Sequence, residues 1–150
     1  MTDMRQLYQE MILEHHRHPR NSGKLEHANR SADGDNPLCG DKLSVHMQVE
    51  EDTIKDISFE AHAGCSISRA SASIMTEALK GKTREEADAL FETFHNMVTG
   101  KTENVDVDAL GKLAVFSTVS EFPSRVKCAI LAWHAARAAM GGDESSVSTE

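Results

Sequence analysis

Apolar side chains near the start of the chain recur at helical spacing. They occupy positions i, i+3, i+4, i+7 and i+8, which predicts a helix with one buried stripe. The pair His18-Pro19 predicts the end of this helix. The members of the stripe are Met4, Leu7, Tyr8, Met11 and Ile12.

The spacing then changes to strict alternation, which is typical of strands with one buried face. Two alternating runs flank the pair Glu51-Asp52 and predict an antiparallel hairpin. Residues 29–35 predict a third strand at the edge of the sheet, although their strand propensity is low and Gly34 weakens a strand interior. The alternating apolar residues are Leu43, Val45, Met47, Val49, Ile57, Phe59 and Ala61.

The second half of the chain returns to helical spacing. Apolar residues between positions 67 and 78 predict a helix that ends at Gly81, and Thr83 with Glu86 predicts a capping box at the start of the next helix. A weaker pattern over residues 108–114 predicts a turn. Pro123 predicts the start of a last helix that ends near Met140.

Strands followed by helices predict an α+β fold, with helices packed on one face of a small antiparallel sheet of about three strands. The 150 residues are enough for one ordinary domain, which we place at residues 1–142. Residues 143–150 are polar and predict a disordered tail.

Composition and charge exclude several classes of function. The 24 acidic and 16 basic side chains give a net charge of −8, which disfavours nucleic acid and favours protein partners. The first 14 residues lack the pattern of a signal peptide, and no apolar run reaches the roughly 18 residues of a membrane span. We therefore expect a cytoplasmic protein without a membrane segment.

Three cysteines and one aspartate form a candidate metal site: Cys39, Asp41, Cys65 and Cys128. An odd number of cysteines in a chain of this size argues against a disulfide framework. Thiolates are the preferred ligands of zinc and of iron–sulfur centres, and a carboxylate can complete a tetrahedron. The predicted elements place Cys39 and Asp41 in the loop before the first long strand, Cys65 between the hairpin and the next helix, and Cys128 in the first turns of the last helix. From these separate parts of the fold they could converge on one ion.

Other interpretations of these residues remain open. A single free cysteine is more often a buried core residue than a ligand. Arg125 precedes Cys128 by three residues and so shares its helical face, where a guanidinium can offset the charge of the ligands. His15, His16 and His18 are typical of a solvated helix end. The serines of residues 66–73 suggest close helix packing and no catalytic role.

Three segments closely resemble the ligand segments of the U-type iron–sulfur cluster assembly family. They are Asn36-Pro37-Leu38-Cys39-Gly40-Asp41, Gly64-Cys65-Ser66-Ile67-Ser68 with the following Ala70-Ser71-Ala72-Ser73, and Arg125-Val126-Lys127-Cys128-Ala129. The early His18-Pro19-Arg20-Asn21 also fits, so the likeness extends from about Tyr8 to Met140. It implies the fold shared by the IscU and SufU branches.

Within that family the chain is more similar to the SufU branch than to the IscU scaffold branch. Scaffold members carry histidine immediately before the third cysteine, where this chain has Lys127, and they lack an insertion like residues 81–101. The resemblance implies that Cys39, Asp41, Cys65 and Cys128 bind Zn²⁺. It also implies relay of sulfur from a cysteine desulfurase that holds pyridoxal phosphate, similar to SufS, toward downstream iron–sulfur scaffold proteins.

Cys39 is the predicted sulfur acceptor, because it lies in a loop beside Gly40, whereas Cys65 and Cys128 lie near helix starts. An acceptor thiolate has to be deprotonated, accessible and able to move. The alternative function is a scaffold that builds a [2Fe–2S] cluster, or binds iron, on the same four ligands. A structural zinc domain is a further alternative, and a hydrolytic zinc enzyme is disfavoured because every ligand position is filled.

Overall fold

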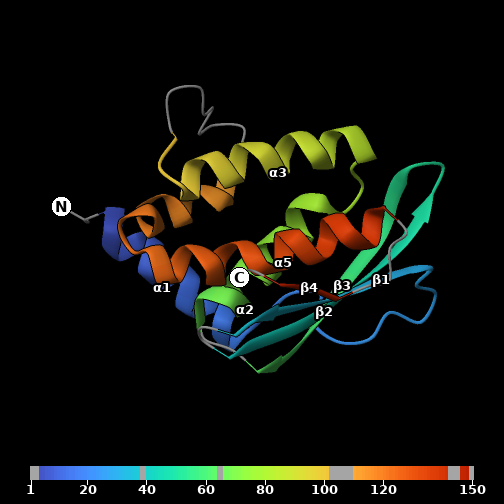
Figure 1. Cartoon of the computed structure of the whole chain (residues 1–150), viewed down its shortest axis with the longest axis horizontal. Helices are drawn as coiled ribbons and strands as arrows, with labels where there is room; N and C mark the ends of the chain where they lie inside the picture. Colours follow the sequence, from blue (N-terminus) through green and yellow to red (C-terminus); the bar gives the residue numbers. More distant parts are fainter. Residues whose placement is uncertain (1–3, 38–39, 64–65, 102–109, 142–145, 149–150) are drawn as a thin grey trace.

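The computed structural model describes residues 4–37, 40–63, 66–101, 110–141 and 146–148. A four-stranded sheet forms one layer and the helices form the other (Figure 1). The elements in chain order are α1 (Met4–Arg17), β1 (Arg30–Asn36), β2 (Asp41–Glu50), β3 (Thr53–Ala63), α2 (Ser66–Leu79), α3 (Arg84–Val98), the 3₁₀ helix η1 (Gly111–Glu121), α5 (Pro123–Met140) and β4 (Ser146–Ser148).

The predicted hairpin and the third strand are confirmed. β1, β2 and β3 pair in antiparallel fashion, and the sheet order is β3-β2-β1-β4. Two expectations are corrected by β4, which pairs in parallel with β1 from Asp33 to Asp35. β1 is therefore not at the edge of the sheet, and residues 146–148 of the predicted disordered tail form a strand.

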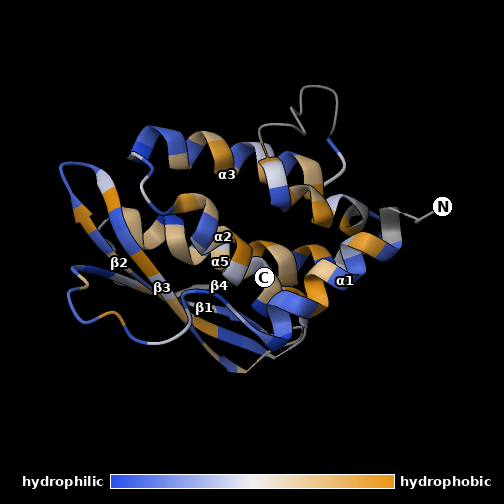
Figure 2. Ribbon diagram, turned by 180° about the vertical axis from the view of Figure 1, so that it is seen from behind, coloured by the Kyte–Doolittle hydropathy of each residue, from blue (hydrophilic) through white to orange (hydrophobic). Residues whose placement is uncertain are grey.

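The helices cover one face of the sheet, as predicted, and α5 crosses β1 and β2 at the centre (Figure 1). Most side chains from Cys128 to Met140 are buried and only Arg137 among them is exposed, so α5 is enclosed on most sides. Figure 2 shows mainly apolar colours along α5, whereas α1 and α3 alternate between apolar and polar residues. The core therefore lies between α5, its neighbouring helices and the sheet.

Gly34 explains how a strand of low propensity supports this packing. A Cβ atom at Gly34 would lie 3.1 Å from Cδ1 of Leu131 and 3.4 Å from Cβ of Ala135, both on α5. Contacts below about 3.4 Å are tighter than packed carbon atoms prefer. The missing side chain therefore lets β1 approach α5 closely.

The ends of the helices agree with the predicted signals. Thr83 and Glu86 form both hydrogen bonds of a capping box at the start of α3, and Gly81 has the positive φ of 85° that suits a glycine after α2. A turn was predicted near residues 108–114, of which residues 110–114 are described. The 3₁₀ helix η1 begins there at Gly111, and its residues Leu113 and Phe116 are buried. None of the described helices is long and apolar enough to cross a membrane.

Candidate metal centre

Asn36 and Asp41 begin the candidate site as a cross-strand pair. They are directly opposite each other where β1 ends and β2 begins, so their side chains share one face of the sheet. Asp41 lies on the same face of β2 as the apolar residues that begin at Leu43. The side chains of Asp41 and Asn36 are both 0% exposed. The sequence placed Asp41 in a loop, whereas it is the first residue of the strand.

Cys128 approaches this pair from α5. Its side chain is 2% exposed, and its Sγ lies 3.5 Å from Nδ2 of Asn36. The same Nδ2 donates to Oδ2 of Asp41 at 3.1 Å, and Cys128 Sγ lies 3.6 Å from the carbonyl oxygen of Ser124. The structure therefore brings together two of the four predicted ligands, Asp41 and Cys128, around one buried amide.

Cys39 and Cys65 lie outside the described residues. The chain passes from Asn36 to Asp41 through residues 37–40, which include Cys39, and from Ala63 to Ser66 through residues 64–65, which include Cys65. Within the part of the chain that the structure describes, no group of three or more histidine, cysteine, aspartate or glutamate side chains could hold a metal. The complete ligand set thus stays a prediction.

The donors that are described fit a divalent cation. A buried carboxylate is costly unless positive charge or hydrogen bonds compensate it, and Asp41 is buried beside a thiol. One carboxylate oxygen with sulfur donors is a combination that zinc accepts. Cys39 and Cys65 are close in sequence to described residues of the hairpin and of α2, and they would supply the remaining sulfur ligands.

Arg125 is exposed, and its guanidinium carbon lies 4.9 Å from the centre of the Phe122 ring. Both residues line a hollow of about 320 Å³ between α1, η1 and the starts of α2 and α5. The charge-compensating role predicted for Arg125 therefore stays a prediction.

The predicted solvated histidine end of α1 is wrong for His15, which is 2% exposed. Its Nδ1 lies 2.7 Å from Oγ of Ser73, and its Nε2 lies 3.7 Å from Oε1 of Glu77. Burial lowers the pKa of His15 below its ordinary value, and the charge of Arg20 lowers it further, while Glu77 acts in the opposite direction. The position of His15 near the helix end carries no information about the packing of α1 on α2, and this packing is what buries the side chain.

The serines of α2 serve helix packing, as expected. Ser68, Ser71 and Ser73 are buried. The hydroxyl of Ser71 donates to the carbonyl oxygen of Ala129 on α5, and Ser73 accepts a hydrogen bond from the backbone N–H of Arg20. These contacts fix the positions of α1 and α5 on α2.

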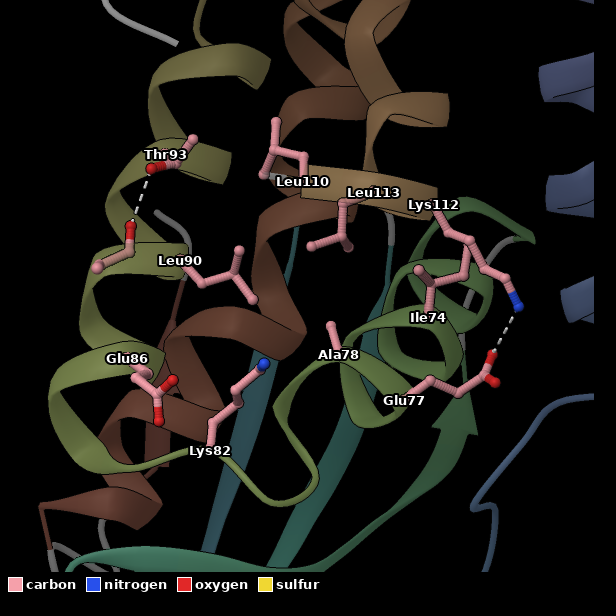
Figure 3. A pocket seen from close by; sticks show the side chains of 11 residues that line it. Ile74, Glu77, Ala78, Lys82, Glu86, Leu90, Thr93, Leu110, Lys112 and Leu113 are labelled. Atoms are coloured by element: carbon pink, nitrogen blue, oxygen red, sulfur yellow. Dashed lines mark hydrogen bonds and ion pairs between the residues drawn. The ribbon is translucent and has the colours of Figure 1, made fainter. Parts of the chain in front are cut away.

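A second cavity, of about 670 Å³, lies between α2, α3 and η1 (Figure 3). Leu90, Leu110 and Leu113 contribute apolar side chains, and Glu77 and Lys112 form an ion pair of 3.9 Å at its side. The described residues that line it include neither Asp41 nor Cys128, so it is separate from the described part of the candidate metal centre.

Asn36 is the described site residue to which the sequence assigned no role. Its position could have been found from the alternation of β1, because Ala32, Gly34 and Asn36 occupy the same face and all are buried. The available signal was a polar residue, Asn36, on the buried face of β1 and close in sequence to Asp41.

Comparisons with known proteins give a consistent result. The family model of the NifU-like N-terminal domain matches residues 7–140. The zinc-dependent sulfurtransferase SufU of Bacillus subtilis (strain 168) is 41% identical over 138 residues, which are 92% of this chain and 92% of that protein. The iron–sulfur cluster assembly scaffold protein IscU of Streptococcus pyogenes serotype M1 is 39% identical over 140 residues, covering 93% of this chain and 86% of that protein.

Solved structures are similar over most of the chain. A crystal structure described as an iron–sulfur cluster assembly scaffold protein for the SUF system of Fervidobacterium islandicum AW-1 has a TM-score of 0.81 and 35% sequence identity. The match covers 87% of this chain and 94% of that one. Another crystal structure, of a protein described as hypothetical, has a TM-score of 0.83 at 40% identity, covering 91% and 98%.

Proposed function

Because the chain belongs to the NifU-like N-terminal domain family, whose members act in iron–sulfur cluster assembly, we propose that it is a zinc-dependent sulfurtransferase. It would accept sulfur from a cysteine desulfurase and pass it on for cluster assembly. The observation that supports this most is the buried Asp41 carboxylate beside the Cys128 sulfur, at the point where the segments with Cys39 and Cys65 adjoin described elements.

The proposed ligands are Cys39, Asp41, Cys65 and Cys128. Bound zinc would keep the sulfur ligands as thiolates and supply no redox chemistry of its own. The chain would provide a site formed by a strand start, a hairpin connection, a segment before α2 and the enclosed helix α5. The carboxylate of Asp41 is the harder and weaker partner for zinc, which makes the site suitable for ligand exchange.

The proposed sulfur step balances without an external oxidant or reductant. The thiolate of Cys39 attacks the outer sulfur of a persulfide on the partner enzyme, and a new S–S bond forms at Cys39. The S–S bond of the partner breaks, and its cysteine leaves as a thiolate. The chain then carries a persulfide that a downstream scaffold protein can accept.

Cys39 is preferred as the acceptor for structural reasons. It precedes Gly40, whose φ of +72° suits a glycine, in a connection of four residues between paired positions. Cys128 is enclosed in α5, where a displacement would disturb Ala129 and Ile130 in the core. Cys65 immediately precedes α2, whose buried serines are bonded to neighbouring helices.

The proposed partner is a pyridoxal-phosphate-dependent cysteine desulfurase, with iron–sulfur scaffold proteins downstream, in the cytoplasm. The net charge of −8 is consistent with protein partners and gives no attraction for nucleic acid.

A second candidate function is supported by the 39% identity to the Streptococcus pyogenes scaffold. In that case the same ligands would hold iron or a [2Fe–2S] cluster during its assembly. Lys127 stands where the scaffold branch carries histidine, and this difference favours the sulfurtransferase.

Metal analysis separates the two candidates. Protein purified without oxygen should contain one zinc per chain, whereas bound iron with acid-labile sulfide would favour the scaffold. The chain is then mixed with a desulfurase and cysteine, alkylated and digested, and the persulfide is located by mass spectrometry. It should appear on Cys39, and Cys39→Ser should abolish stimulation of the desulfurase with the fold intact. A persulfide on Cys128 in the wild type, with sulfur uptake retained in Cys39→Ser, would show that the acceptor is wrongly assigned.

A further inference from the structure

Asn36 is a fully buried polar side chain in contact with two residues of the candidate metal centre. Its Nδ2 lies 3.1 Å from Oδ2 of Asp41 and 3.5 Å from Sγ of Cys128, and these two residues belong to different elements. One amide nitrogen carries two hydrogens, so a single side chain can donate to both atoms. Asn36 thereby links the start of β2 to α5.

The orientation of the amide follows from the atoms around it. A flipped side chain would place the carbonyl oxygen against the Asp41 carboxylate, which is an acceptor and would repel it. With the nitrogen in that place, Oδ1 of Asn36 is buried and has no hydrogen-bond partner among the described residues. A buried oxygen without a hydrogen bond lowers stability. The Asn36 side chain therefore contacts Asp41 and Cys128 through Nδ2 at the expense of a hydrogen bond to its Oδ1.

We infer that Asn36 is a positioning residue for the metal centre, which holds the Asp41 carboxylate and the Cys128 sulfur together before the ion binds. This inference rests on the metal site of the proposed function. An N–H donor strengthens its bond to an acceptor that carries negative charge, and both acceptors do so as ligands. Outer hydrogen bonds of this kind orient ligands and raise metal affinity.

The geometry of the sheet makes this arrangement specific to position 36. Asn36 is opposite Asp41 in the ladder and shares the buried face with Gly34, whose close approach to Leu131 brings α5 near the strand. A neighbouring residue on β1, such as Asp35, points to the opposite face. The donor is therefore fixed by backbone pairing rather than by a flexible connection.

The test exchanges the amide for an apolar side chain of similar size. Asn36→Leu removes both donors. Asn36→Ala removes them without adding carbon volume, which keeps the test decisive if the leucine variant fails to fold. The matched control is Asn29→Leu, because the Asn29 side chain makes two hydrogen bonds of 2.8 Å to the backbone of Val49, away from the site. All variants are compared with wild type by thermal unfolding.

Two readouts report on the metal centre directly. Competition with a chromophoric chelator gives the zinc dissociation constant, and the absorption spectrum of the cobalt-substituted protein reports the geometry of the ligands. We expect both Asn36 variants to raise the zinc dissociation constant by about 10- to 100-fold and to shift the cobalt bands. Asn29→Leu should lower the unfolding temperature and leave both readouts at the wild-type value.

The outcomes separate this inference from the proposed function. Wild-type affinity and an unchanged cobalt spectrum in the folded Asn36 variants would overturn the inference alone. A weakened metal site in those variants, with no sulfur transferred to wild-type Cys39, would support the inference and overturn the sulfurtransferase. A wild-type chain that binds neither zinc nor cobalt would overturn both.

Discussion

Two polar clusters that contain buried side chains differ in how their hydrogen bonds are completed. The first, here the α1–α2 joint, consists of His15, Arg20, Asn21, Ser73 and Thr76. Ser73 Oγ lies 2.7 Å from His15 Nδ1 and accepts from the backbone of Arg20 at 2.8 Å. Asn21 donates to Thr76, which donates to the carbonyl oxygen of Ser73. Donors and acceptors are matched within the joint.

The second cluster, at the metal centre, gathers Asp41 and Cys128 around the single amide of Asn36. Here a carboxylate and a sulfur meet, and the oxygen of Asn36 lacks a partner among the described residues. Buried polar groups that complete each other indicate a structural role, because nothing further is needed to offset their burial. A buried carboxylate beside a cysteine sulfur is instead a pair of donor atoms suited to a cation. The comparison therefore predicts that the joint affects stability and the metal centre affects binding.

The largest expected effect is the loss of metal in Cys128→Ala. Removing a ligand should weaken zinc binding by more than the about 10- to 100-fold expected for an outer hydrogen-bond partner. The free energy of unfolding of the metal-free chain should fall by only about 1 kcal/mol, because alanine suits the interior of α5. Chelator competition and denaturant unfolding measure the two quantities. A variant with wild-type zinc affinity would remove Cys128 from the ligand set.

Ser73→Ala is expected to have the opposite profile. It leaves His15 Nδ1 and the backbone N–H of Arg20 without their shared partner, which should lower the free energy of unfolding by about 1–3 kcal/mol. Zinc affinity should stay at the wild-type value, because Ser73 makes no described contact with Asp41 or Cys128. Denaturant unfolding and chelator competition test both parts, and a weakened zinc site would break the distinction between the clusters.

A smaller effect concerns pH and the joint. Burial lowers the pKa of His15 below its ordinary value, so protons bind the unfolded chain more readily than the folded one. The contribution of this histidine is complete above its unfolded pKa of about 6.5 and is lost as the pH falls toward the lower folded pKa. For one histidine, the free energy of unfolding should change by no more than about 1.4 kcal/mol per pH unit. The charged groups around it are Arg20, Glu14, Glu77 and Lys112.

The measurement is denaturant unfolding of the metal-free chain between pH 5 and pH 8, for wild type and His15→Gln. The variant should show a smaller loss of stability below about pH 6.5. The stability of the His15→Gln variant should still decrease somewhat at low pH, because burial lowers the pKa of His134 and the charges of His95 and Arg137 lower it further. An identical pH profile in the two proteins would show that His15 does not titrate differently on folding.

Local signals in the sequence predicted much of the fold. Spacing predicted α1, α2 and the β2–β3 hairpin, Pro123 predicted the start of α5, and the Thr83–Glu86 pair predicted the start of α3. β1 was the weakest of these expectations, because its low propensity is offset by pairing on both sides and by the fit of Gly34 against α5. β4 had no local signal, since its strand depends on the edge that β1 offers.

The candidate site was predictable in its chemistry and less so in its geometry. Residue types and the family resemblance predicted Asp41 and Cys128, which the structure brings together. The phase of β2 could have placed Asp41 on the buried face, but the segment was treated as a loop. The alternation of β1 could likewise have placed Asn36 on the buried face. Its contact with Cys128, 92 residues away, and the contact of His15 with Ser73, 58 residues away, required knowledge of the tertiary structure.

The alternation that brings Asn36 and Asp41 to one face also restricts how these strands can change length during evolution. One residue inserted between Asp41 and Leu43 would turn either the carboxylate or the apolar row toward the opposite face. A relative with such an insertion would need a bulge to absorb it, as β3 already has at His62, opposite Lys42 and Leu43. Insertions and deletions in this half of the molecule should therefore accumulate between residues 24 and 28, outside the strands and the residues bonded to them, and leave the spacing from Asp41 to Val49 unchanged.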